Sequence, residues 1–320
     1  MYKTKYINLT IFFLTLIVLL PPKEAFAQEY FAGKITYQVN YKSPDGHTNA
    51  SYLAQENQID SIVYYIQKGN YKSETFFEGE LTESYVFHQN SKWVHYQFLD
   101  KDYYLSIDAT TEQMNQAWKF NWLNEEEVIL NYTTTNAEVT QGYQKENIFY
   151  ADEIRVNPED FKTHNYAHWY TTLKATNGRL PLKNLYFDAN YIEIKEAIKI
   201  EHIEFEPDFF EPNPKYLQVV YREILEQEAQ LKTLSASAEE CYNNKVEEIE
   251  GKLILGKNDH YLLQVVVDEN GQPIKAKSMT NKEEFYKVAE EIVLQCGFEF
   301  EPAVYQNKTV KSELYIPIQL

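Results

Sequence analysis

Between residues 30 and 108, short runs of alternating apolar and polar residues limit the possible fold more than any other feature of the sequence. In the run KITYQVNY, the apolar residues Ile35, Tyr37, Val39 and Tyr41 share one parity. The runs SIVYYIQ, YKSETFF, ESYVFHQ, KWVHYQF and DYYLSI continue the pattern, and the polar turns KGN, EGEL and QNS separate several of them. Because successive side chains of a strand point to opposite faces, this repetition predicts an antiparallel meander, either an open curved sheet or a barrel-like one.

The β-rich pattern continues to about residue 210, with one interruption. Between residues 110 and 144 the alternation weakens, and the run NWLNEEEVIL is interpreted as a short helix. Strand-like runs return in NIFYADEIRV, NLYFDANYIEI and EAIKIEHIEFE, and aromatic residues, which favour strands, make up 15% of the chain. We therefore expect a β-rich domain over residues 28–210.

The proline-rich stretch EPDFFEPNPKY marks the end of this domain. After Pro214, the run KYLQVVYREILEQEAQLKTL places apolar residues close to helical spacing. Proline is favourable in the first turn of a helix because its missing N–H has no partner there. The sequence therefore predicts a linker helix within residues 211–240 and a further domain over residues 241–320.

The last domain has the pattern of a compact β-β-α-β unit. In YLLQVVVD the odd positions from Tyr261 to Val267 are apolar, and DENG is a hairpin turn in which Asn270-Gly271 suits positive φ. After the return strand, residues from Phe285 to Cys296 form one apolar stripe of helical spacing, and alternation resumes at the end of the chain. The expected fold class is α+β: an N-terminal antiparallel β-rich domain, built as a curved open sheet or half-barrel, then the linker helix and this small domain.

Pro317 lies on the outward parity of the predicted last strand and has no N–H to donate to a neighbouring strand. Because proline is confined to edge strands or strand ends, we predict an edge strand whose backbone pairs with a partner protein. The partner-binding residues are then Lys311, Glu313, Tyr315 and Pro317. The alternative is that Pro317 protects the edge from pairing.

The first residues have the pattern of an export signal. Lys3 and Lys5 precede an apolar run over residues 7–20, and Ala25-Phe26-Ala27 suits signal peptidase. The run is shorter than the ~20 residues that span a bilayer, which favours a cleaved signal over residues 1–27 rather than an uncleaved anchor. We expect a periplasmic or secreted protein with no transmembrane span after cleavage.

Charge and missing motifs narrow the function further. The formal net charge of −18 disfavours nucleic acid and anionic lipid headgroups as partners, because both would be repelled. The sequence contains no GxGxxG, GxxxxGK[ST], GxSxG or HExxH motif. His164 and His168 in HNYAH are interpreted as ordinary histidines rather than metal ligands. We expect no enzymatic activity, no cofactor and no metal.

The chain has two cysteines, Cys241 and Cys296. In an exported protein an even number of cysteines favours a disulfide. Two buried free thiols are an equally good interpretation. An activated catalytic thiol is disfavoured, because no histidine stands in a suitable arrangement beside either cysteine.

The C-terminal region resembles the C-terminal domain of TonB-type energy transducers. In that family a V-D-x-x-G hairpin and a helix precede an aromatic-x-P-A segment, an N-G-x-x-V turn and a closing P-I strand. The matching positions are Val267, Asp268 and Gly271; Phe300, Pro302 and Ala303; Asn307 and Val310; and Pro317 and Ile318. The resemblance covers about residues 246–320. It implies a module that binds a protein segment by strand addition, here without the Pro-rich spacer that force transmission needs.

The N-terminal meander, with YADEIRVNP and GRLPLK, is similar to exported proteins with a LolA-like half-barrel. In that family a concave sheet and its covering helices enclose an apolar cavity. Two functional hypotheses follow. The first is a non-enzymatic cell-envelope protein that binds an envelope or outer-membrane protein through its edge strand. The second is a periplasmic carrier of a lipid or other apolar ligand, held by the N-terminal β-rich domain.

Overall fold

The computed structural model describes residues 30–44, 50–111, 118–142, 144–250, 260–279 and 285–320, so the predicted signal over residues 1–27 lies outside the described residues. Within these ranges, one mixed sheet of fifteen strands dominates the fold, beside two short two-stranded sheets. The strand order in the large sheet is β15-β14-β19-β12-β6-β5-β4-β3-β2-β1-β11-β10-β9-β8-β7.

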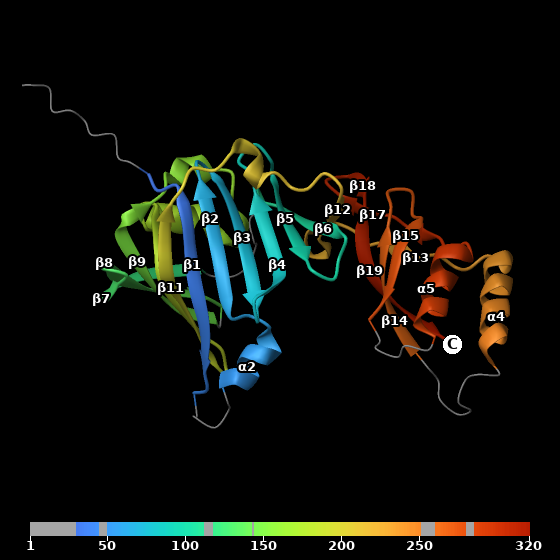
Figure 1. Cartoon of the computed structure of the whole chain (residues 1–320). Helices are drawn as coiled ribbons and strands as arrows, with labels where there is room; N and C mark the ends of the chain where they lie inside the picture. The colour runs from blue at the N-terminus through green and yellow to red at the C-terminus, as the bar shows by residue number, and fades with distance from the viewer. Residues whose placement is uncertain (1–29, 45–49, 112–117, 143, 251–259, 280–284) are drawn as a thin grey trace, which may run out of the picture.

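The first six strands form the antiparallel meander that the alternating runs predict, with each strand hydrogen-bonded to the next. Strand β1 also pairs with β11, so the antiparallel strands β7 to β11 extend the same sheet on its other side (Figure 1). The bounds are β1 Gly33–Lys42, β2 Ser61–Gln67, β3 Asn70–Phe77, β4 Glu80–Phe87, β5 Trp93–Phe98, β6 Tyr103–Asp108, β7 Trp118–Ile129, β8 Tyr132–Gln141, β9 Gln144–Arg155, β10 Arg179–Phe187 and β11 Ile192–His202. The helix α2, Ala50–Asn57, packs beside β1.

The short helix predicted for NWLNEEEVIL is wrong, because this run belongs to β7. Strand β7 pairs with β8 on both sides of a register shift between Trp122 and Glu126. Asn124, inside the shift, has a positive φ of 57°. A bulge of this kind adds residues that break the alternation without ending the strand, which is why the sequence pattern weakens here.

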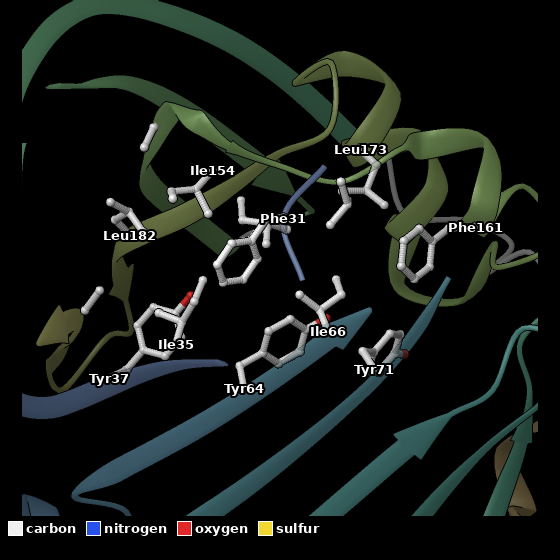
Figure 2. Close-up of a cluster of buried hydrophobic side chains, with 14 of the residues drawn as sticks. Phe31, Ile35, Tyr37, Tyr64, Ile66, Tyr71, Ile154, Phe161, Leu173 and Leu182 are labelled. Atoms are coloured by element: carbon white, nitrogen blue, oxygen red, sulfur yellow. The ribbon is translucent and has the colours of Figure 1, made fainter. Parts of the chain in front are cut away.

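We call the face of the sheet that carries Tyr37, Tyr64 and Tyr71 the inner face. Two short helices cover it over β1 to β3: η1, Pro158–Phe161, and α3, Trp169–Ala175. A third, η2, Tyr166–His168, directly precedes α3. Figure 2 shows the labelled side chains of β1 to β3 on one face of the sheet, with Ile66 and Tyr71 near Leu173 and Phe161. Phe161 and Leu173 are both buried in this N-terminal core. The space over this part of the sheet is therefore filled by side chains.

Strand β12, Leu217–Val220, joins the two parts of the molecule. It runs parallel to β6 on one side and meets β19 on the other, where Val220 pairs with Ser312. The expected α+β arrangement, with a separate small domain after the β-rich one, is therefore wrong: the C-terminal strands continue the same mixed sheet. In place of the predicted linker helix, residues 211–235 contain β12, a turn η4 (Arg222–Ile224) and the two-residue strand β13 (Gln230–Leu231). Val219 and Val220 are buried between the neighbouring strands, and this pairing outweighs the approximate helical spacing.

The C-terminal elements follow the predicted order, with β14 at His260–Val267, β15 at Pro273–Ser278, α5 at Tyr286–Gln295 and β19 at Ser312–Gln319. The helices α5 and α4 (Ala236–Glu250) lie on one side of these strands (Figure 1). A second hydrophobic core forms there, and it contains the odd positions of β14 from Tyr261 to Val267. The hairpin glycine, Gly271, has the predicted positive φ, at 83°.

Three short strands complete the C-terminal region: β16, Phe300–Glu301; β17, Ala303–Tyr305; and β18, Lys308–Val310. Strand β16 pairs with β13, and β17 and β18 form a hairpin. A last short helix, η3, spans Pro207–Phe210 before β12. No helix in the described ranges is both long and apolar enough to cross a membrane.

Candidate functional site

Phe87 of β4 and Val94 of β5 are still buried in the N-terminal core, but toward Glu83 of β4 and Phe98 of β5 the cover ends and a cleft opens. The end of the cleft at Glu83, which we call the inner pocket, has a volume of about 150 Å³. An open groove of about 610 Å³, the outer groove, adjoins it and leads toward β19. The two share Phe98, Leu105 and Tyr221 as lining residues, and together we call them the junction cleft.

Strand pairing brings the floor of the inner pocket together. Glu83 of β4 lies opposite Phe98 of β5. Tyr96 of β5 lies opposite Leu105 of β6. On the other side of β6, Leu105 is paired with Val219 of β12. Because directly opposite residues share a face of the sheet, the side chains of Glu83, Phe98 and Tyr96 all belong to the inner face.

Two tyrosines from irregular segments form the walls. Tyr166 begins η2, and its backbone N–H donates to the carbonyl oxygen of Ala109 at 3.0 Å. Tyr221 directly follows β12, and its backbone N–H donates to the carbonyl oxygen of Ser106, also at 3.0 Å. Both segments are therefore anchored to the end of β6, which fixes the walls relative to the floor.

Glu83 is the only charged residue lining the inner pocket. Its carboxyl group is partly buried, and burial raises its pKa above the usual value of 4.5. Among the described residues, no side chain or backbone group makes a hydrogen bond or ion pair with it. A partly buried carboxylate without a partner is costly, and such groups cluster at functional sites.

Burial in the pocket also raises the pKa values of its tyrosines. Burial is the main reason why the pKa of Tyr96 is raised, and the nearby Tyr85, Tyr166, Glu83 and Tyr221 add to it. The pKa of Tyr221 is also raised, first by burial and then by the charge of Glu223, to which its hydroxyl donates at 3.3 Å. All of these phenols stay neutral at ordinary pH and are available as hydrogen-bonding groups.

A buried polar network closes the far end of the outer groove. The carboxylate of Glu313 accepts from Lys101 Nζ at 2.9 Å, from the Tyr103 hydroxyl at 2.8 Å and from Gln264 Nε2 at 2.8 Å. Gln264 Nε2 also donates to the Tyr315 hydroxyl at 3.0 Å. The side chain of Glu313 is only 3% exposed. Its three partners come from β6, from β14 and from the turn before β6, so they hold the junction in one geometry.

Further contacts tie the β5–β6 end of the sheet to the C-terminal region. The carboxylate of Asp108 accepts from Lys92 Nζ at 2.9 Å and from the Tyr305 hydroxyl at 2.7 Å. Burial acts to raise the pKa of Asp108, but hydrogen bonds from Thr110, Tyr305 and Lys92 outweigh it, and the pKa is lowered. At the surface, Lys277 pairs with Asp100 at 3.0 Å. These contacts hold β6 and the turn before it against the C-terminal region.

The structure separates the four residues predicted to bind a partner protein. Glu313 is buried in the network above, and Lys311 is half-buried and paired with Glu269 at 2.5 Å. Tyr315 and Pro317 are exposed, and Tyr315 also lines the outer groove. Strand β19 pairs with β14 along its whole length but with β12 only at Ser312. Its start therefore lies between two strands, and the predicted free edge is limited to the residues after Ser312. The sequence pattern missed this because it assigned β12 to a helix.

The two cysteines and His164, the other residues singled out in the sequence, have contacts typical of a structural role. Cys241 of α4 and Cys296 after α5 are joined by a disulfide. His164 is buried, and its Nε2 lies 2.5 Å from the hydroxyl of Tyr71. Burial lowers the pKa of His164 to about 4. Among the described residues, no group of histidines, cysteines or carboxylates is placed to hold a metal ion.

The residues of the junction cleft were not among the sites predicted from the sequence. One signal was present: in the run ESYVFHQ, Glu83 has the same parity as Tyr85 and Phe87, so a carboxylate stands on the aromatic face of the strand. Tyr166 and Tyr221 gave no such signal, because they lie in turns far away in the sequence.

No family model matches the chain, and no curated protein sequence matches it. Among solved structures, PNGF-II aligns at 11% identity with a TM-score of 0.38 over 75% of this chain and 44% of that one, so this chain spans less than half of its length. MucB aligns at 10% identity, with a TM-score of 0.31, over 67% of this chain and 66% of that one. LprF from Mycobacterium bovis aligns at 9% identity, with a TM-score of 0.23, over 58% and 90%. These likenesses are too low to establish either resemblance predicted from the sequence, and the site is interpreted from its own residues.

Proposed function

We propose that this chain is an exported, non-enzymatic protein of the cell envelope that binds a small amphipathic molecule in the junction cleft. The observation that carries the proposal is the cleft itself: an aromatic pocket with one unpartnered carboxyl group opens into a polar groove. Ligand sites are typically concave, mostly apolar and equipped with a few polar groups, and they favour the boundary between two packed regions. The junction cleft has each of these properties.

The arrangement supports a division of roles along the cleft. Phe98, Leu105 and Tyr221 line both parts, so an apolar segment can lie across them without leaving a hydrophobic surface. The outer groove offers carboxylates and two cations at its rim, and it is open to solvent. The sequence predicted an apolar ligand inside the N-terminal half-barrel, but side chains fill the space over β1 to β3. The proposed ligand site is therefore the junction cleft, at the β4–β6 end of the sheet.

A fluorescent apolar amine, N-phenyl-1-naphthylamine, tests the proposal. Titrated into the purified chain from residue 28 onward, it is expected to bind saturably with increased fluorescence. Tyr221→Ala removes the aromatic side chain shared by both parts of the cleft and is expected to weaken binding by about tenfold or more.

Tyr216→Ala is the matched control. Tyr216 is also half-buried, but it packs against Tyr104 on the opposite face of the sheet, at 5.3 Å between ring centroids. The affinity of the Tyr216→Ala variant for N-phenyl-1-naphthylamine should equal that of the wild type. If the wild type shows no saturable binding, or if the two variants lose affinity equally, the cleft is not a ligand site.

A protein partner is a second candidate, because strand pairing on one side of β19 is incomplete. Its ladder to β12 ends at Ser312, whereas β14 pairs with it as far as Gln319. Tyr315 and Pro317 are exposed in this stretch. Replacing Tyr315 and Pro317 with serine should abolish capture of an envelope protein, with N-phenyl-1-naphthylamine binding retained at the inner pocket. Unchanged capture by this variant would exclude the strand.

A further inference from the structure

The inner pocket combines negative charge with aromatic walls and contains no basic residue. Its only charged residue is Glu83, and the other lining side chains are aliphatic or aromatic. Elsewhere in the sheet, partly buried carboxylates have partners: Glu74 lies 2.6 Å from Lys72 Nζ, and Glu313 has Lys101. Glu83 differs because no described residue supplies the positive charge that would match it.

The two basic residues of the outer groove already form ion pairs. Lys101, in the outer groove, is paired with Glu313 at 2.9 Å, and Arg222 is paired with Glu228 at 3.3 Å. Glu223 adds a further negative charge next to Tyr221. An anionic group entering the inner pocket would therefore meet only like charges, whereas a cation would find a carboxylate and several electron-rich ring faces.

The size of the inner pocket limits what it can hold. At about 150 Å³, the inner pocket far exceeds the ~10–15 Å³ that a cavity needs to hold one water molecule. It has room for an ammonium group with its attached carbon atoms. A larger body attached to the ammonium group would extend into the outer groove, which adjoins the inner pocket at Phe98, Leu105 and Tyr221.

From this combination, the geometry points to an organic ammonium group as the part of the ligand that enters the inner pocket. Glu83 is its counter-ion. Tyr96, Phe98, Tyr166 and Tyr221 surround the charge, by their ring faces for a methylated ammonium and by phenolic oxygens for one that carries N–H bonds. This inference rests on the proposed function, and it adds the chemical class of the ligand.

Competition with N-phenyl-1-naphthylamine by small matched molecules tests the inference. Hexyltrimethylammonium, hexylamine and 1-hexanol share the same alkyl chain and differ in the headgroup. At neutral pH, one or both of the cations should displace the probe at a concentration at least tenfold lower than 1-hexanol does. The ranking of the two cations decides between ring faces and phenolic oxygens as the main contact.

Two variants isolate the role of the charge. Glu83→Gln keeps the shape of the side chain and removes its charge, so affinity for the preferred cation should fall about tenfold or more while affinity for 1-hexanol stays the same. Glu80→Gln, at the exposed start of the same strand, is the matched control and should change neither. If the probe binds the wild type but neither cation outcompetes 1-hexanol, or Glu83→Gln binds the cation normally, the inference fails and the proposed function stands. If the probe does not bind at all, the proposed function itself fails.

Discussion

The two ends of the inner face show what happens to the same aromatic strand pattern with and without a covering helix. Over β1 to β3, η1 and α3 complete the core, and Phe161 is fully buried. Phe87 of β4 and Val94 of β5 belong to the same core, but beyond them the cover ends at Tyr166, and Tyr96 and Phe98 remain only half-buried. Alternation along a strand therefore determines which face is apolar, but not whether that face becomes a core or a binding surface.

The two regions also differ in the kind of polar group that they bury. In the closed region, the hydroxyl of Tyr71 and Nε2 of His164 satisfy each other at 2.5 Å. In the open region, Glu83 has no such partner among the described residues. Neutral buried groups without a partner occur in the closed region too, at the hydroxyl of Tyr64, Nδ1 of His164 and Nε1 of Trp169. Glu83 differs from them because an ionised carboxylate is far more costly to bury unpaired than a neutral group, and this cost favours a binding role for it.

The largest expected effect comes from opening the closed region. Phe161→Ala should lower the free energy of unfolding by about 3–5 kcal/mol, because it leaves a cavity in a fully packed core. Phe98→Ala, the same substitution at a half-buried ring of the cleft, should cost less than half as much but weaken binding of N-phenyl-1-naphthylamine. Urea unfolding and probe titration measure the two. Equal losses of stability would show that the cleft is packed like the core.

The disulfide offers a second comparison, between the cleft and the C-terminal core. Replacing Cys241 and Cys296 with alanine removes a link between residues 55 positions apart and should lower the free energy of unfolding by about 2–4 kcal/mol. The cleft lies on the opposite face of the sheet from α4 and α5, so probe affinity should change less than twofold below the unfolding transition. A large loss of affinity would mean that the C-terminal core controls the shape of the cleft.

The network around Glu313 defines the geometry of the junction. Glu313→Gln leaves the ammonium group of Lys101 without its counter-ion in a site where that side chain is only 11% exposed. We expect a loss of about 2 kcal/mol in the free energy of unfolding, together with weaker probe binding because the outer groove loses its fixed end. Lys277→Ala, which removes only a surface pair with Asp100, should cost under about 1 kcal/mol. A similar cost for both would show that the network is solvated.

Local pattern was sufficient for much of the fold. Parity predicted the hairpins of β1 to β6, and the odd positions of β14 from Tyr261 to Val267 are buried as expected. Val266 is buried as well, because it packs against Tyr103 and Leu105 of β6 and Val219 of β12. The sequence of β14 alone could not reveal this contact.

The failures share a physical cause. The strand conformation of β12 depends on its pairing with β6, about a hundred residues earlier, and with β19, about a hundred residues later. Its own four residues, LQVV, fit a helix stripe nearly as well. The cleft depends on the same long-range pairing, because Glu83, Tyr96, Tyr166 and Tyr221 come from four separate segments. Only the parity of Glu83 was visible in advance.

The smallest expected effect is a pH dependence of opposite sign in the two regions. Burial lowers the pKa of His164 from 6.5 to about 4, so the folded state binds fewer protons than the unfolded one in that range. The closed region therefore loses stability as pH falls from 6.5 toward 4. Glu83 has a pKa raised above 4.5, so the folded state binds more protons there, and its contribution to stability falls as pH rises through that raised pKa.

Comparing Glu83→Gln with the wild type isolates the second effect, since the histidines contribute equally to both proteins. The groups facing Glu83 are Tyr85, Tyr96, Tyr166 and Tyr221, which stay neutral in this range, and Glu223 beyond them. The variant should have a higher midpoint of thermal unfolding than the wild type at neutral pH and an equal one below pH 4.5. Binding of hexyltrimethylammonium to the wild type should strengthen over the same rise in pH, because only the ionised carboxylate attracts it. A variant that is less stable than the wild type at neutral pH would mean that the carboxylate of Glu83 already has a stabilising partner, and the contrast between the closed and open regions would disappear.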